Sequence, residues 1–115
     1  MTPISPLALV QRQLDAYNAH DLEAFLGAYS DRILMFRMPS PEPTISGKAQ
    51  LAEFYAKNRF NVPGLRAELL NRMEMGNKVV DHERVTGLRD APFEVVCVYE
   101  VGRESIERVW FFAAE

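Results

Sequence analysis

The alternating side chains of residues 65–75 constrain the fold of this chain more than any other feature. Every second residue in this segment is apolar except Asn71, and most of the residues between them are charged. The alternating set is Leu65, Ala67, Leu69, Asn71, Met73 and Met75. A period of two predicts a strand with one covered face and one wet face. Gly76-Asn77 then predicts a two-residue hairpin turn, with Lys78 to Leu88 as the return strand.

The segments on both sides of this hairpin complete an α+β pattern. Further strands are predicted at Ile33 to Met38, Phe93 to Val101 and Ser105 to Phe112. Pro39, Pro41 and Pro43 predict a loop after the first of these strands. Helix starts are predicted at residues that cap helices or suit a first turn, namely Ser5-Pro6, Asp21 and Ser46-Gly47. The sequence therefore predicts three N-terminal helices packed on one face of a curved antiparallel sheet.

Composition narrows the class of protein. The 115 residues suffice for a single domain, 1–115, and the net charge of −3 argues against a nucleic-acid partner. The single cysteine, Cys97, excludes an intrachain disulfide. No apolar run reaches the length of a membrane span, and residues 1–6 lack the basic region of a signal peptide. We therefore expect a cytoplasmic protein with no membrane partner.

The hairpin turn predicts which side chains share a face. It pairs Asn71 with His82 and Leu69 with Arg84, on the side that the helices cover. Thr86 follows on this covered face. The predicted wet face holds the charged set Arg66, Glu68, Arg72, Glu74, Asp81 and Glu83. A guanidinium beneath helices is costly unless it is paired or reaches water, so Arg84 predicts a cavity between helices and sheet.

Two alternatives explain the same residues without a cavity. His82 is then a satisfied core histidine bonded to Asn71, and Arg84 reaches the sheet rim or pairs with a carboxylate not yet placed. His82 and Glu83 are neighbours on a strand and point to opposite faces, so no metal site is predicted. The sequence has no glycine-rich phosphate loop, and we expect no cofactor.

Short segments along nearly the whole chain carry a family resemblance: Tyr17-Asn18-Ala19-His20-Asp21-Leu22, Tyr29-Ser30-Asp31, Gly47, Gly76-Asn77-Lys78-Val79-Val80, His82-Glu83-Arg84-Val85 and Ile106 to Phe112. In this order they resemble the nuclear-transport-factor-2-like superfamily, which includes SnoaL-like cyclases, ketosteroid isomerases and limonene-epoxide hydrolase. The resemblance implies a cone-shaped α+β barrel with a pocket at its open end. It also implies a homodimer formed through the outer face of the sheet.

The resemblance carries the catalytic residues of these enzymes over only in part. It places the tyrosine and the two aspartates of a ketosteroid isomerase at Gln13, Arg37 and Cys97, none of which has the required chemistry. The arginine of the epoxide hydrolase is matched by Arg84, whereas its two acids are replaced by Thr86 and Phe111. The resemblance therefore implies the frame of the superfamily and no single reaction.

We expect a pocket for a small apolar molecule with a carbonyl or anionic group. His82 is predicted as the general acid–base and Arg84 as an electrophilic stabiliser, because an imidazole titrates near neutral pH. The predicted ligand-binding residues are Leu14, Tyr17, Phe25, Met35, Arg37, Phe54, Tyr55, Asn71, Met73, Cys97, Tyr99 and Phe111. Such a pocket suits an isomerase, a cyclase or a hydrolase. The alternatives are a non-catalytic carrier or sensor, and a dimerisation module with an incidental cavity.

The last two strands carry large apolar residues on both faces. If the turn at Gly102-Arg103-Glu104 has three residues, the inner set is Cys97, Tyr99, Val109 and Phe111, and the outer set is Val96, Val98, Trp110 and Phe112. A two-residue turn instead puts Trp110 with Cys97. An apolar outer face needs a partner, so the first arrangement predicts a homodimer.

Overall fold

The computed structural model describes residues 5–113, which form three helices and six strands. The helices are α1 (Pro6–Asn18), α2 (Leu22–Gly27) and α3 (Lys48–Asn58). The strands are β1 (Tyr29–Arg37), β2 (Ile45–Ser46), β3 (Arg66–Met75), β4 (Lys78–Thr86), β5 (Phe93–Val101) and β6 (Ile106–Ala113). Within residues 5–113, no helix combines the length and the apolar character that a membrane crossing requires.

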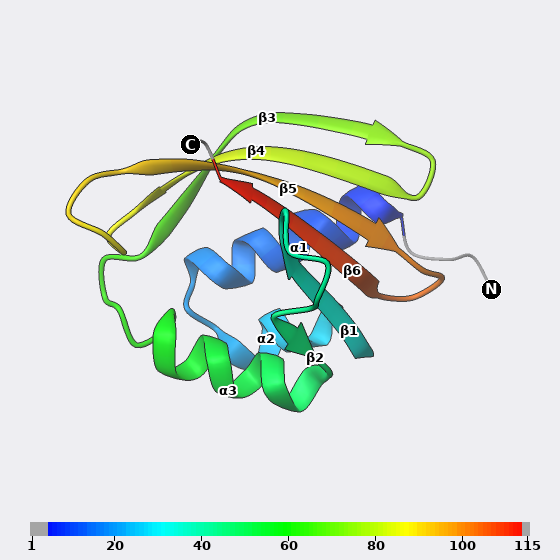
Figure 1. Cartoon of the computed structure of the whole chain (residues 1–115), viewed down its shortest axis with the longest axis horizontal. Coiled ribbons are helices and arrows are strands. Elements are labelled where there is room, and N and C mark those ends of the chain that lie inside the picture. Colours follow the sequence, from blue (N-terminus) through cyan, green and yellow to red (C-terminus); the bar gives the residue numbers. More distant parts are fainter. Residues whose placement is uncertain (1–4, 114–115) are drawn as a thin grey trace.

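The six strands of this described part form one curved sheet in the order β2-β1-β6-β5-β4-β3. Figure 1 shows the sheet arched over the three helices, which confirms the predicted α+β fold. Every neighbouring pair of strands is antiparallel except β1 and β6, which run parallel and make the sheet mixed. The alternation in a strand indicates its faces but not its partner, so the β1–β6 contact was not expected from the sequence.

The helix starts lie where the sequence predicts them. The Ser5 side chain accepts a hydrogen bond from the Ala8 N–H at 3.4 Å, and Pro6 occupies the first turn of α1. The Asp21 carboxylate accepts one from the Ala24 N–H at 3.1 Å. These caps satisfy backbone donors that have no partner inside the helix. The short strand β2 was not predicted, because three prolines precede it in the loop after β1.

The link between α1 and α2 anchors the helices to one end of β3. The Asn18 amide accepts a hydrogen bond from the Ala67 N–H at 2.8 Å and donates one to the Ala67 carbonyl at 2.9 Å. The His20 ring nitrogen lies 2.7 Å from the Leu65 carbonyl oxygen. The segment from Tyr17 to Asp21, which carried part of the family resemblance, thus fixes which face of β3 the helices cover.

A β-bulge in β3 determines which side chains of the β3–β4 hairpin face the helices. The predicted pairing holds from the turn as far as Asn71 and His82, but Leu69 then pairs with Glu83 instead of Arg84. An extra residue in one strand turns the following side chains to the opposite face. Odd-numbered side chains of β3 therefore point to one face of the sheet before the bulge and to the other face after it.

The predicted faces of β4 are wrong as a result of this bulge. The inward side chains are Val79, Asp81, Glu83 and Val85, all of which are buried. His82 and Arg84 alternate with them and lie on the outer face, as does Met73, which is 60% exposed. Arg72 pairs with Asp81 as predicted, but the pair is buried beneath the helices and not wet.

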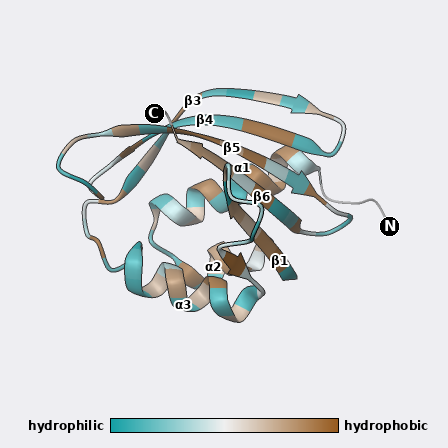
Figure 2. Cartoon of the chain, in the orientation of Figure 1, coloured by the Kyte–Doolittle hydropathy of each residue, from teal (hydrophilic) through white to brown (hydrophobic). Residues whose placement is uncertain are grey.

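The core lies between the inner face of the sheet and the helices. Cys97 pairs with Phe111 and Val98 pairs with Trp110, which is the first of the two predicted arrangements of β5 and β6. Cys97, Tyr99 and Val109 are buried with Phe25 of α2. Figure 2 shows strongly hydrophobic colours on β2 and along the middle of β1, which contribute Ile45, Ile33 and Met35 to this core.

Candidate functional site

A partly open cavity lies between α1, α3 and the inner face of the sheet. It leaves about 80 Å³ in which the centre of a water molecule fits. Because one water needs roughly 10–15 Å³ of such space, the cavity can hold several waters or the compact ring of a small organic molecule. Arg37 and Arg89 are exposed residues of its wall, so they mark its mouth.

Two loops meet at this mouth and fix its shape. Gly87, which has a φ of +84°, lies so close to Gly64 that a Cβ atom on Gly87 would lie 2.0 Å from the Gly64 carbonyl oxygen. Only glycine permits this approach, which holds the β4–β5 loop against the segment that follows α3. Both loops lie on the left of Figure 1.

Glu83 is the one carboxylate on the cavity wall among residues 5–113. It is 6% exposed, and its Oε1 accepts a hydrogen bond from the Cys97 thiol at 3.9 Å. Its Oε2 is buried and has no hydrogen-bond partner in the described residues. Burial, and next the negative charge of Asp81, raise the pKa of Glu83 from 4.5 to about 7. This carboxyl group is therefore poised to gain and lose a proton near neutral pH.

The neighbouring carboxylate differs because it has a full set of partners. Asp81 is completely buried, and its two oxygens accept hydrogen bonds from Arg72 at 2.7 and 2.9 Å. A third nitrogen of this guanidinium donates to the Gln11 side chain at 2.7 Å. Asp81 is thus held in a structural ion pair, whereas Glu83 Oε2 is buried without a hydrogen-bond partner in the described residues.

Gln13 of α1 joins two tyrosines of the cavity wall. The Tyr29 hydroxyl donates to Gln13 Oε1 at 3.0 Å, and Gln13 Nε2 donates to the Tyr99 hydroxyl at 3.1 Å. Since Tyr99 accepts in this chain of hydrogen bonds, its own proton remains for another acceptor. Hydrogen bonds in a chain polarise one another, which makes the Tyr99 hydroxyl a stronger donor.

The phenol groups of the cavity stay protonated at neutral pH. Burial raises the pKa of Tyr55 to about 12, and it raises the pKa values of Tyr17, Tyr29 and Tyr99 well above the usual 10. Burial also raises the pKa of the Cys97 thiol, and the charge of Glu83 adds to this effect. The cavity thus offers neutral hydrogen-bond donors around one titrating carboxyl group.

Most of the predicted ligand-binding residues lie on this cavity wall. They are Leu14, Tyr17, Phe25, Arg37, Tyr55, Cys97, Tyr99 and Phe111. Met35 and Phe54 line a smaller adjoining cavity, which shares Arg37, Tyr55 and Phe111 with the first. Their role as ligand contacts remains a prediction.

Four of the predicted site residues lie away from the cavity. Asn71, Met73, His82 and Arg84 are on the outer face, so the prediction that they point beneath the helices is wrong. The imidazole of His82 lies 2.5 Å from Glu94, and the guanidinium of Arg84 lies 3.3 Å from Glu68. Arg84 therefore has the carboxylate partner of the alternative interpretation, while His82 bonds Glu94 and not Asn71.

Some of the positions that the resemblance assigned to catalytic residues line the cavity, and the others lie on the outer face. Gln13, Arg37 and Cys97, which stand at the ketosteroid isomerase positions, all line the cavity, and so does Phe111. Arg84 and Thr86 follow the outward alternation of β4 and do not line it. In the described part of the chain, no group of three His, Cys, Asp or Glu side chains is placed to hold a metal ion.

Sequence reasoning missed Glu83, Tyr29, Arg59 and Arg89 as residues of the site. A signal for Glu83 was present, because Leu70 is an apolar residue in the otherwise charged set of β3. Two adjacent leucines break the period of two in the way that one inserted residue does. Arg59 and Arg89 lie outside the regular elements, and loops give no periodicity from which to place a side chain.

The comparison with known families gives a clear result. The profile of the SnoaL-like domain family matches residues 10–109. The chain belongs to the SnoaL-like family. This membership confirms the predicted nuclear-transport-factor-2-like resemblance. Among curated proteins, none matches the chain.

Solved structures of SnoaL-like and related proteins have the same fold. An uncharacterised cystatin-fold protein from Novosphingobium aromaticivorans is 25% identical, with a TM-score of 0.85 over 94% of this chain and 97% of that one. A "putative ketosteroid isomerase" from Kribbella flavida is 22% identical, with a TM-score of 0.82 over 96% and 78%. A SnoaL-like protein of unknown function from Burkholderia thailandensis is 22% identical, with a TM-score of 0.80 over 98% and 99%.

Proposed function

We propose that this SnoaL-like protein binds a small apolar carbonyl compound and moves a proton of that compound with Glu83. The observation that carries the proposal is the buried Glu83 carboxyl of the cavity wall, which has a pKa of about 7 and whose Oε2 has no hydrogen-bond partner in the described residues. A base works best when its pKa lies near the working pH. We assign the acid–base role to Glu83 and not to its neighbour His82, because His82 lies on the outer face.

The proposed reaction is a proton shift next to a carbonyl group. The Glu83 carboxylate removes a proton from the carbon beside the carbonyl, and the C–H electron pair moves into an enolate. The Tyr99 hydroxyl, polarised through Gln13, donates a hydrogen bond to the enolate oxygen. Protonated Glu83 then returns the proton to another carbon, which regenerates the base and completes an isomerisation. No further reactant is needed.

The names of similar structures favour this reaction class. The Kribbella flavida protein is named for ketosteroid isomerisation, and a Sinorhizobium meliloti protein with a TM-score of 0.78 and 14% identity is named for polyketide cyclisation. Both reactions begin at a carbon beside a carbonyl group. At these identities the likeness supports the fold, and the chemistry comes from Glu83.

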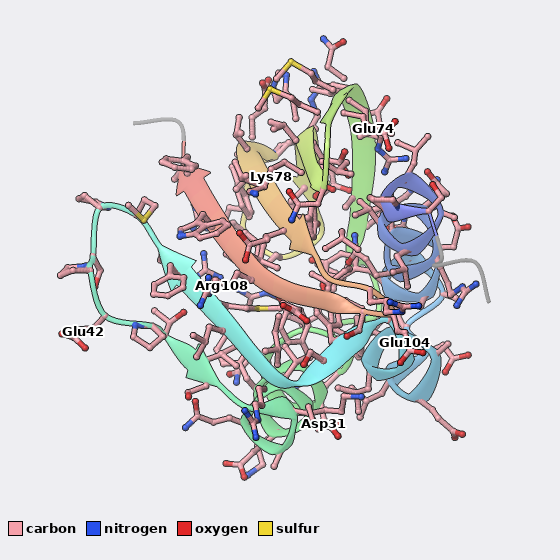
Figure 3. The ribbon with its side chains drawn as sticks, turned by 90° about the vertical axis from the view of Figure 1, so that its right-hand side faces the viewer. Asp31, Glu42, Glu74, Lys78, Glu104 and Arg108 are labelled. Carbon is pink, nitrogen blue, oxygen red and sulfur yellow. The ribbon has the colours of Figure 1, made fainter. Side chains whose placement is uncertain are left out.

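We also propose that the protein works as a homodimer in the cytoplasm. The outer face of the sheet carries Val96, Val98, Trp110 and Phe112, and the Trp110 ring stacks on Phe36 at 5.9 Å. Ion pairs flank this apolar area, since Lys78 and Arg108 lie 3.3 and 3.2 Å from Glu100 (Figure 3, where Lys78 and Arg108 are labelled). An apolar centre with a charged rim is the usual anatomy of a protein interface.

Proton exchange tests the enzymatic proposal without knowledge of the natural substrate. The protein is incubated in D₂O with a β,γ-unsaturated cyclohexenone, and NMR follows both deuterium incorporation and formation of the conjugated isomer. We expect exchange that rises with pH through about 7 as Glu83 ionises. Glu83→Gln should remove the exchange, and Glu68→Gln, a change of an exposed glutamate on the same hairpin, should leave it intact.

Results that contradict the proposed proton transfer distinguish between the alternative functions. Ligand-induced thermal stabilisation without exchange would contradict proton transfer and favour a carrier or sensor. Neither stabilisation nor exchange would leave a dimerisation module with an incidental cavity. Exchange that persists in Glu83→Gln would remove Glu83 from the proposed role.

A further inference from the structure

The mouth of the Glu83 cavity gathers three arginines from separate parts of the chain. Arg37 ends β1, Arg59 follows α3, and Arg89 lies in the β4–β5 loop. In the described residues, none of the three lies within ion-pair distance of a carboxylate. The net charge of the chain is nevertheless negative. An uncompensated positive group at the mouth of a cavity attracts anions and raises their local concentration.

Each of these guanidinium groups lies over an aromatic ring. Arg37 is 5.2 Å from the centre of the Phe111 ring, Arg59 is 5.0 Å from that of Phe54, and Arg89 is 4.0 Å from that of Phe93. Stacking of this kind holds the planar group in place and leaves its N–H edge available. Within the described part of the chain, Arg59 is the one of the three whose guanidinium donates a hydrogen bond, from Nη1 to the Asn58 carbonyl at 2.8 Å.

The cavity behind the arginines has a different chemistry. Its apolar wall includes Leu14, Phe25 and Phe111, and its one carboxylate among the described residues is Glu83. The enclosed space suits a single small ring more than a large fused one. A ligand that fills both regions has a compact apolar body and a negative end. Guanidinium groups recognise a carboxylate in particular, because two parallel N–H donors match its two oxygens.

We propose that the ligand of this pocket carries a carboxylate, which Arg37, Arg59 and Arg89 bind at the mouth while the reacting carbon lies beside Glu83. The inference rests on the proposed function, since it gives the substrate class for the same pocket. The substrate is then a small oxo acid, with its carbonyl inside the cavity and its carboxylate outside. The arginines position the substrate, and the proton transfer remains with Glu83.

Matched ligands test the inference. 4-Oxocyclohexanecarboxylate, its amide and its methyl ester share one ring and one ketone and differ only in the charged end. Calorimetry gives their dissociation constants, and NMR in D₂O gives exchange of the protons beside the ketone. We expect the carboxylate to bind about tenfold or more tightly than the two neutral compounds, as loss of a charge-assisted contact predicts.

Arginine variants locate the contact. Arg37→Gln, Arg59→Gln and Arg89→Gln should each weaken binding of the carboxylate several-fold and leave binding of the amide unchanged. Arg103→Gln is the matched control, because Arg103 is an exposed arginine of the β5–β6 loop that does not line the cavity. It should change neither affinity.

Three results would overturn the inference: equal affinity for the charged and neutral compounds, equal losses in Arg103→Gln and the mouth variants, or no binding of the carboxylate. The fate of the proposed function is read separately. If Glu83-dependent exchange of the neutral ketones survives while charge has no effect, the proton-transfer proposal stands and the carboxylate inference fails. If the arginines bind the carboxylate but no exchange occurs, the carboxylate inference stands and the proton-transfer proposal fails.

Discussion

The two faces of the sheet differ in how completely their charged side chains are paired. On the outer face of β4, His82 and Arg84 both have carboxylate partners, Glu94 and Glu68 respectively. On the inner face, Asp81 is paired with Arg72, but Glu83 Oε2 has no hydrogen-bond partner and the arginines of the cavity mouth have no carboxylate partner in the described residues. Paired charges stabilise a surface or an interface, whereas unpaired charges beside a cavity cost stability and mark a binding site. The position of each residue in the alternation of one strand thus decides its role.

The buried ion pair beside Glu83 should give the largest effect of any change in this comparison. Arg72→Met leaves the completely buried Asp81 without a partner, so we expect a loss of about 3–5 kcal/mol in the free energy of unfolding. Arg84→Met on the outer face should cost below about 1 kcal/mol. Urea unfolding measures both. Asp81→Asn in the Arg72→Met background should recover part of the loss, and equal costs on the two faces would contradict the comparison.

Glu83 should make the protein less stable as the pH rises. Its pKa is about 7 in the folded chain and about 4.5 when unfolded, so the folded state binds the proton more tightly between these values. Stability is then highest below about pH 4.5, falls through about pH 7 and levels off above it, by about 3 kcal/mol in total. Thermal or urea unfolding across this range measures the fall.

The isosteric change of the same residue provides the control. Glu83→Gln removes the titrating group, so this variant should lose the fall in stability between about pH 4.5 and 7 and be more stable than the parent above about pH 8. Glu68→Gln, on an exposed side chain, should keep the parent profile. An unchanged profile in Glu83→Gln would show that Glu83 titrates in the ordinary acid range.

The apolar outer face should respond to a charge through self-association. Val98 lies at the middle of this face, opposite Trp110, so Val98→Glu should weaken a dimer about hundredfold while the fold remains intact. Sedimentation equilibrium should give twice the mass of the chain for the parent and a single chain for the variant. Leu7→Glu, at an exposed apolar residue of α1, is the control that should remain dimeric. A monomeric parent would contradict the proposed homodimer.

The smallest effects belong to the residues that the sequence analysis placed in the site. His82→Gln and Arg84→Met should change ligand affinity and proton exchange less than about twofold, because both side chains lie on the outer face in surface ion pairs. Circular dichroism should give an unchanged fold. A strong loss of exchange in His82→Gln with an intact fold would return this residue to the site.

Local chemistry made most of the fold predictable from sequence. Ser5, Asp21 and the Gly76-Asn77 turn each act on their immediate neighbours, so the helix starts and the hairpin lie where expected. The parallel contact of β1 with β6 depends on a long-range packing choice that no local pattern encodes. Strand β2 was not predicted for the same reason, because its pairing with β1 depends on the path of the loop between the two strands.

The site was predicted less well, and one residue explains why. The turn fixed the pairing correctly up to Asn71, and Ala67 is covered as predicted, but the extra residue at Leu70 puts Asn71 and Met73 on the opposite face from Ala67. His82 and Arg84 therefore lie on the outer face. A cavity lies between the helices and the sheet, and most of the predicted ligand-binding residues line it, but the carboxylate on its wall in the described residues is Glu83, and His82 does not line it. A period-two pattern gives the correct face only while the strand has no bulge.

The titration of Glu83 tests the central claim most directly. The side-chain carboxyl ¹³C resonance, assigned by its loss in Glu83→Gln, can be followed by NMR from acid to alkaline pH. A buried carboxyl with a free oxygen predicts a midpoint close to pH 7. A midpoint near the ordinary glutamate value of about 4.3 would mean that this side chain is solvated. The assignment of the acid–base group, and with it the proposed function, would then be wrong.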